Sequence, residues 1–167
     1  SSQPIFDHVY GKANQFAVIF SILGIPMAIA FFASNTFISF FGANRVAKFT
    51  ISSAFLLNIT SLIVALLNGG VPNFWIWLVL MGFSNIFLSL LTPIGLSLAL
   101  EPMGALAGTA SGVAGAISLG GAALLATIFS SQINESVTPL IIGYLLYSTM
   151  SLLLIFFAES KKDISFY

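Results

Sequence analysis

The sequence predicts an all-α integral membrane protein with five transmembrane helices. Composition is the first reason: of 167 residues, 58% are hydrophobic and only 6% are charged, whereas a soluble domain carries about 25% charged residues. So few charges cannot coat a soluble globule of this size, which excludes a soluble enzyme and a disordered linker. The net charge is zero, so no basic excess exists to bind nucleic acid.

The spacing of the charges is the second reason. A spanning helix needs about 20 apolar residues, because a hydrocarbon core of about 30 Å is crossed at about 1.5 Å per residue. The charge-free stretches 13–44, 102–134 and 136–158 hold one helix each, while 49–100 is twice as long and breaks at the turn cluster 68–73. We therefore expect an outer segment at 1–13, helices at 14–41, 49–67, 74–98, 104–130 and 137–158, and a cytoplasmic tail at 159–167.

The Lys and Arg residues predict the orientation of these helices. The loops after the first, third and fifth helices share one side of the membrane, and the other side has only Lys12. Excess Lys and Arg mark the cytoplasmic side, so the N-terminus is expected outside and the C-terminus inside. An outside start also leads us to expect a preceding helix, and hence a fragment of a larger protein. The basic residues of the inner side are Arg45, Lys48, Lys161 and Lys162.

The predicted helix 104–130 carries a stripe of small residues. Gly104, Gly108 and Gly112 recur every four residues, and Gly115 extends their face. Small faces allow helices to approach closely in lipid. The stripe is interpreted either as a packing face without a ligand or as a helix that slides against a neighbour, and these two interpretations are compatible.

The polar residues within the predicted helices are uncharged. Ser84 and Asn85 lie about one turn from Ser89, and such groups either line a solute pathway or bond between helices. No ionisable residue is expected at mid-membrane, so a proton-carrying residue is expected elsewhere in the protein. No metal-site, cofactor or enzyme motif is present, and we expect neither a cofactor nor enzymatic activity. Other embedded polar residues include Asn58, Tyr144, Tyr147 and Ser148.

Two short blocks carry a resemblance to a known family. Residues 98–104 (Leu-Ala-Leu-Glu-Pro-Met-Gly) and 107–112 (Ala-Gly-Thr-Ala-Ser-Gly) resemble the C-terminal half of Bcr/CflA-type drug:proton antiporters of the major facilitator superfamily. Arg45 and Lys48 take the place of that family's basic cytoplasmic loop, although Asn44 stands where the loop motif has Asp. The signature residues are Glu101, Pro102, Gly104, Gly108, Thr109 and Ser111.

The resemblance implies a location, a function and a set of partners. The five helices would be the eighth to twelfth of the family, in a bacterial inner membrane, beside a missing N-terminal half of the same protein. The function would be export of small-molecule drugs in exchange for protons by alternating access. The alternatives are a major facilitator for another solute, such as a sugar, peptide or metabolite, and a non-transporting membrane subunit. The expected substrate-lining residues are Asn35, Ser84, Asn85 and Ser89.

Overall fold

The computed structural model describes residues 5–130 and 136–164 and is helical throughout, with no strand among the described residues. Five of its helices are long and apolar enough to cross a membrane, which agrees with the predicted membrane fold. A short π-helix precedes the five, and a short 3-10 helix lies between the third and the fourth of them. In chain order the elements are η1 (Ile5–Val9), α2 (Ala13–Phe41), α3 (Ala43–Leu67), α4 (Phe74–Leu100), η2 (Glu101–Leu106), α5 (Ala107–Ser130) and α6 (Thr138–Ile164).

The outer surface of the bundle is apolar. Large side chains such as Phe32, Phe40 and Leu67 are 77%, 78% and 81% exposed. Burial of apolar surface is the main favourable term in folding in water, so a bundle with this surface is suited to lipid rather than to water. The composition of the sequence is therefore explained by the surface as well as by the core.

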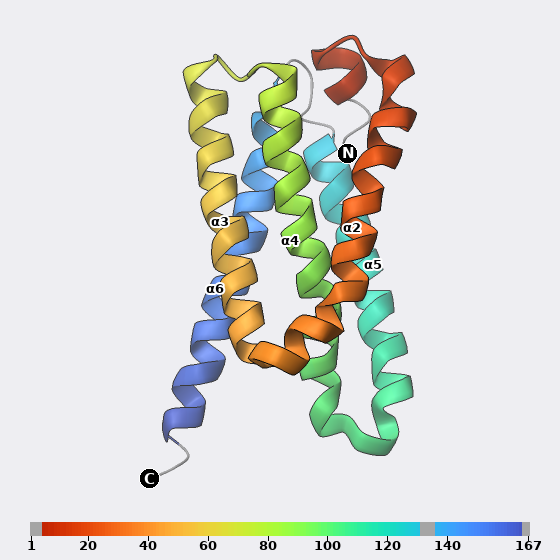
Figure 1. The fold of residues 1–167 in the computed structure, drawn as a ribbon, viewed down its shortest axis with the longest axis vertical. Coiled ribbons are helices and arrows are strands. Elements are labelled where there is room, and N and C mark those ends of the chain that lie inside the picture. Colours follow the sequence, from red (N-terminus) through yellow and green to blue (C-terminus); the bar gives the residue numbers. More distant parts are fainter. Residues whose placement is uncertain (1–4, 131–135, 165–167) are drawn as a thin grey trace.

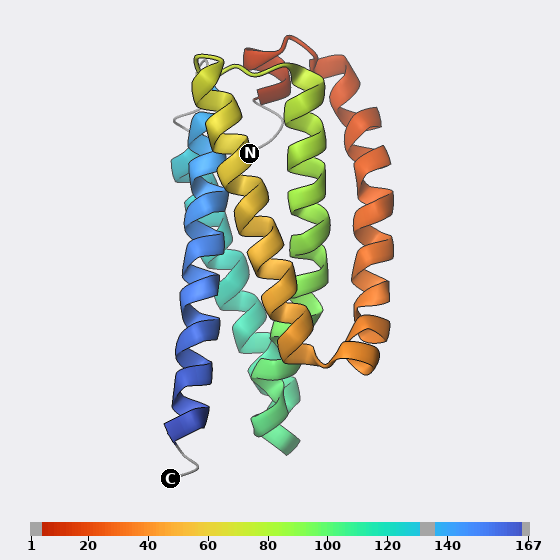
Figure 2. The same ribbon diagram turned by 60° about the vertical axis from the view of Figure 1, so that its left-hand side comes forward.

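The helices form an antiparallel bundle in which α4 is central (Figures 1 and 2). Helix α4 packs against both α2 and α3, and α3 packs in turn against α6. Helix α5 makes far fewer contacts with α4 and α6, and no residue in its apolar window is buried. We call the end of the bundle that carries η1 and the α3–α4 loop the η1 end, and the opposite end the Gly42 end.

The helix bounds differ from the predicted ones by more than two residues in three places. Helix α3 begins at Ala43 rather than 49, because Gly42 alone makes the turn from α2 with a φ of 82°. Arg45 and Lys48 therefore lie in the first two turns of a helix, and the prediction of a loop there was wrong. Helix α5 begins at Ala107 after η2 rather than at 104, and α6 continues to Ile164 beyond the predicted 158.

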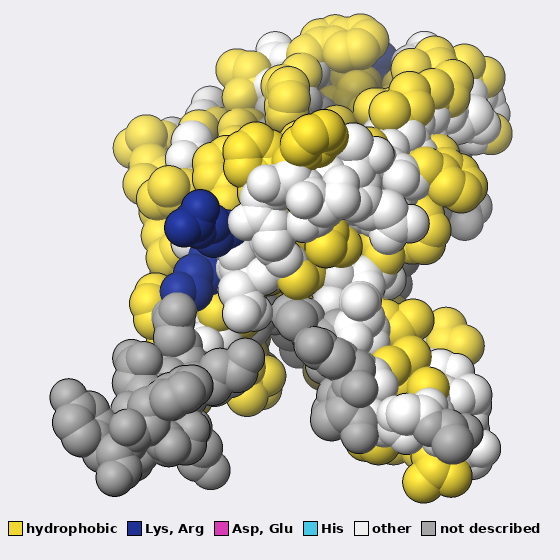
Figure 3. All heavy atoms as spheres, turned by 60° about the horizontal axis from the view of Figure 1, so that its bottom comes forward, with side chains coloured by type: hydrophobic (Ala, Val, Ile, Leu, Met, Phe, Trp, Pro, Cys, Tyr) yellow, Lys and Arg dark blue, Asp and Glu magenta, His cyan; other side chains and the backbone are white. Residues whose placement is uncertain are grey.

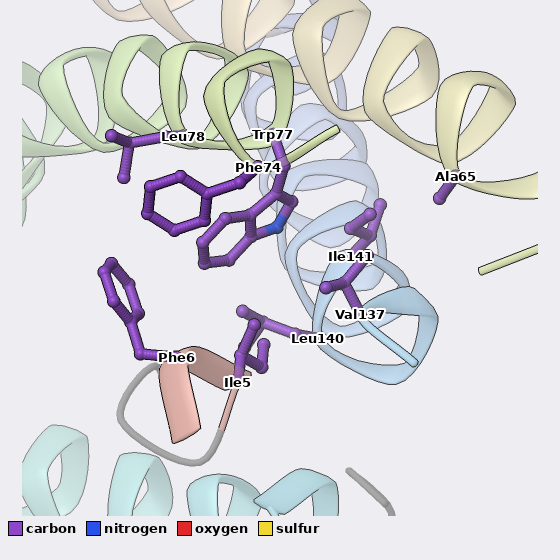
Figure 4. Close-up of a cluster of buried hydrophobic side chains, with 9 residues drawn as sticks. All are labelled: Ile5, Phe6, Ala65, Phe74, Trp77, Leu78, Val137, Leu140 and Ile141. Atoms are coloured by element: carbon purple, nitrogen blue, oxygen red, sulfur yellow. The ribbon is translucent and has the colours of Figure 1, made fainter. Parts of the chain in front are cut away.

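The largest buried cluster lies at the η1 end (Figure 4). Ile5 and Phe6 of η1 are fully buried and pack against Phe74 and Trp77 at the start of α4. The Phe6 ring meets those of Phe74 and Trp77 edge to face, at centroid distances of 5.4 and 5.7 Å, a favoured aromatic geometry. The segment before α2 is thus held on the ends of α4 and α6 rather than free of the bundle.

Candidate functional site

Three helices are joined by hydrogen bonds in the interior of the bundle. The Asn58 side-chain amide of α3 donates to the Tyr144 carbonyl of α6 at 3.3 Å and to the Ser148 hydroxyl at 3.4 Å. The Tyr144 hydroxyl donates to the Asn85 side-chain oxygen of α4 at 3.2 Å. Interhelical hydrogen bonds of this kind stabilise helix association in lipid. Tyr144 of α6 is therefore hydrogen-bonded to both α3 and α4.

A groove runs beside this network, between α4, α5 and α6. Its volume is about 400 Å³, which is within the usual range of about 300–1,000 Å³ for small-molecule sites. Most of the wall is apolar, and the polar groups that reach it are one amide and two phenols. The lining residues are Asn85, Leu88, Ala122, Leu125, Ala126, Leu140, Gly143, Tyr144 and Tyr147.

The groove is neutral. None of its lining residues is acidic or basic, so the site can recognise a ligand through shape, aromatic contact and hydrogen bonds but not through an ion pair with these side chains. One of the two hydrogens of the Asn85 amide nitrogen is already used, since the nitrogen donates to the Met81 carbonyl at 2.8 Å. Tyr147 is 53% exposed, which makes it the most exposed of the three residues with a polar side chain in the lining.

The four residues expected to line a substrate cavity do not share one surface. Asn85 lies in the groove, whereas Ser84 lines a separate small cavity between α3, α4 and α6. Ser89 donates its hydroxyl to the Asn85 carbonyl at 2.9 Å and lines neither cavity. Asn35 is exposed on α2 and also lies outside both. The sequence reasoning did not select Tyr144 and Tyr147, although their spacing with Ser148 marks one face of α6.

The glycine stripe of α5 faces no neighbour among the described residues. A methyl group added at Gly108, Gly112 or Gly115 would meet no heavy atom within 4 Å. The stripe remains a predicted packing face for a segment that the described residues do not include. Gly104 lies in η2 with a φ of 49°, a conformation that favours glycine where the chain turns from α4 into α5.

The family-signature residues gather where the chain passes from α4 to α5. Glu101 and Pro102 are in η2, and their side chains lie outside the described part of the structure. Thr109 is exposed in the first turn of α5, and the Ser111 hydroxyl donates to the Gly108 carbonyl at 2.8 Å. This link lies at the Gly42 end of the bundle (Figure 1).

The same end carries the basic residues of α3. Figure 3 looks onto it and shows Lys and Arg side chains among described side chains that are otherwise hydrophobic or uncharged. Arg45 is exposed and Lys48 is partly buried. Cationic side chains at the end of a spanning helix can reach the lipid headgroups while their stems stay in apolar surroundings.

The η1 end is closed by hydrogen bonds and aromatic contacts. The Tyr10 hydroxyl donates to the Pro72 carbonyl at 2.9 Å, and partial burial raises the pKa of Tyr10 to about 12. The Lys12 ammonium lies 5.2 Å from the centroid of the Phe74 ring, within the range of a cation–π contact. These contacts tie the segment before α2 to the α3–α4 loop. Comparisons with protein-family models, with curated proteins and with solved structures give no match.

Proposed function

We propose that this chain is the C-terminal part of a secondary active transporter that exports drugs or other small molecules by proton antiport with alternating access. The observation that supports the proposal best is the neutral groove between α4, α5 and α6, with its few polar groups set in an apolar wall. Ligand sites in helix bundles have this composition. That transport is outward and coupled to protons is proposed from the resemblance of residues 98–112 to drug:proton antiporters.

The groove suits an amphipathic solute. Leu88 and Leu125 offer apolar contact area on opposite helices, and Tyr147 offers a hydroxyl and an aromatic face. A neutral site of this kind would accept solutes of different shapes, because apolar contact discriminates weakly between similar molecules. The protons would be carried by ionisable residues elsewhere in the whole protein, since no acidic or basic residue lines the groove.

The experiment is drug accumulation in a bacterium whose own pumps are deleted and which expresses the full reading frame. Leu125→Trp places an indole in the groove, and Leu124→Trp is its matched control, because Leu124 is the neighbouring residue, is 69% exposed and does not line the groove. We expect Leu125→Trp to lower export about tenfold, equivalent to about 1.4 kcal/mol in the barrier, and Leu124→Trp to leave it unchanged.

Two results would contradict the proposal. Unchanged accumulation across a broad drug panel despite good expression would argue against drug export. Equal loss in Leu124→Trp and Leu125→Trp, with equal expression, would argue against the groove as the solute site.

One observation favours a second candidate, a non-transporting membrane subunit. Helix α5 has no buried residue in its apolar window, and a helix with an unpartnered glycine stripe suits a surface that packs against another protein. The two candidates differ in what lies upstream in the gene. An upstream reading frame without further helices would favour the subunit, whereas one with intramembrane charges would favour the transporter.

A further inference from the structure

Ser84 carries a buried hydroxyl that, unlike those of nearby serines, has no hydrogen-bond partner among the described residues. The residue is 2% exposed. Ser61 and Ser89, in contrast, donate to the carbonyl one turn earlier in their own helices, at 2.8 and 2.9 Å. Buried hydroxyls in proteins nearly always have a partner, which is frequently an ordered water. The Ser84 oxygen therefore calls for a partner from outside the chain.

The Ser84 side chain lines a small cavity between α3, α4 and α6. The cavity has a volume of about 10 Å³, at the lower end of the roughly 10–15 Å³ that a single buried water needs. Asn58 and Ser61 of α3 and Tyr144 of α6 are the other residues of the lining whose side chains carry an amide or a hydroxyl. Trp77 also lines it, and Figure 4 shows the indole ring of Trp77 beside α6, near Leu140 and Ile141.

The hydrogen-bonding capacity of the lining matches a water molecule. The Ser84 hydroxyl is free to donate. Ser61 has used its hydrogen on the Leu57 carbonyl, so its oxygen is left to accept. Asn58 has used its amide nitrogen on α6, so its side-chain carbonyl is also left to accept. One donor and two acceptors are the complement of a water that accepts one bond and donates two, and buried waters typically make about three bonds.

We propose that this cavity binds a single water molecule, which accepts from Ser84 and donates to Ser61 and Asn58, and so links α3 to α4 in the interior of the bundle. An ion does not suit the cavity, because its lining includes no acidic or basic side chain and a buried charge without a counter-charge is strongly disfavoured. The proposal is independent of transport, and it adds a site to the Asn58–Tyr144–Asn85 network.

The test is X-ray radiolytic labelling of the full chain in lipid nanodiscs, since radicals formed from a bound water oxidise the side chains next to it. Trp77 is the reporter, because it is 2% exposed and lines the cavity. Ile5 is the control, because it is fully buried, belongs to the same buried cluster as Trp77 and does not line the cavity. After correction for intrinsic reactivity, we expect Trp77 to be labelled at least about fivefold more than Ile5.

Two variants separate a bound water from slow entry of solvent. Ser84→Val removes the donor and fills the space, and we expect it to bring Trp77 labelling down to that of Ile5. Ser84→Ala removes the donor but leaves the space, and we expect it to lower the unfolding midpoint. Thr50→Val is the matched control, because Thr50 also has an unpartnered buried hydroxyl and does not line this cavity. Its midpoint should stay or rise, since removing an unpaired buried hydroxyl is favourable.

The wild-type labelling decides the proposal even if a variant fails to fold. Trp77 labelling equal to that of Ile5 would overturn it. Trp77 labelling that persists in a folded Ser84→Val protein would also overturn it, and so would a Ser84→Ala midpoint that rises as in Thr50→Val.

Discussion

Substitution of Gly70 tests the junction that joins α3 to α6 at the η1 end. Gly70 has a φ of 88°, and a methyl group there would collide with the Ser136 hydroxyl. The same methyl group would lie 3.4 Å from the Thr138 hydroxyl. The Gly70 carbonyl accepts from the Val137 amide at 3.0 Å and from the Ser136 hydroxyl at 3.1 Å. Gly70→Ala therefore strains the backbone and pushes apart the groups that hold the start of α6.

The magnitude follows from comparison with the preceding residue. Gly69 has a φ of 63°, and a methyl group there meets nothing within 4 Å. Gly69→Ala should therefore cost only the left-handed conformation, about 1–2 kcal/mol. Gly70→Ala adds overpacking of about 1–3 kcal/mol and the weakening of one hydrogen bond, about 0.5–1.5 kcal/mol. We expect the loss of unfolding free energy in Gly70→Ala to exceed that in Gly69→Ala by about 1.5–4.5 kcal/mol.

The assay is reversible unfolding of both variants in mixed micelles of mild detergent and SDS, followed by circular dichroism and tryptophan fluorescence. Both tryptophans, Trp75 and Trp77, lie close to the junction at the start of α4, so fluorescence reports the local change. Equal destabilisation of the two variants would refute the reasoning, because it would mean that Ser136 does not occupy the space beside Gly70.

Three further predictions concern the two ends of the bundle and the glycine stripe. Because burial raises the pKa of Tyr10 to about 12 from its ordinary value of 10.0, stability should fall as pH rises from about 10 to 12. Tyr10→Phe should flatten that fall in an alkaline unfolding series, and an unchanged slope would contradict the assignment. Gly112→Ala should preserve the free energy of unfolding or raise it by up to about 1 kcal/mol, because helix propensity improves and no described atom is near; a clear decrease in the thermal midpoint would count against this. Single cysteines at Val71 and Asn44, both exposed in a chain without cysteine, should react with an impermeant maleimide from the outside and the cytoplasm, respectively. The reverse pattern would overturn the predicted orientation.

The five spans were predictable because few backbone conformations are stable in the hydrocarbon core of a membrane. A backbone in hydrocarbon must satisfy its own hydrogen bonds, so long charge-free stretches become helices. The start of α3 was not predictable in the same way, because Arg45 and Lys48 resemble loop residues in a scan for charge-free stretches. Nothing in residues 43–48 breaks a helix, however, and Gly42 makes the turn alone.

The candidate site was only partly predictable, since it depends on helix rotation and on distant partners. Ser84 and Asn85 are adjacent in sequence, but successive residues are rotated by about 100° around a helix, so they reach different cavities. The bond between Asn58 and Ser148 joins residues 90 positions apart. A single sequence contains no signal for that pairing, and Tyr144 gains its role only from the helices on either side of it.

The packing of the bundle explains why α5 stands apart. In lipid, apolar area does not hold helices together, because lipid tails are as apolar as the side chains. Hydrogen bonds and close contact must do so, and α3, α4 and α6 have both through Asn58, Tyr144 and Asn85. In α5 the hydroxyls of Ser111 and Thr127 donate within their own helix, and its glycines meet no described neighbour. We therefore predict that a segment packing against the glycine face in the membrane would set the position of α5, and with it the width of the groove.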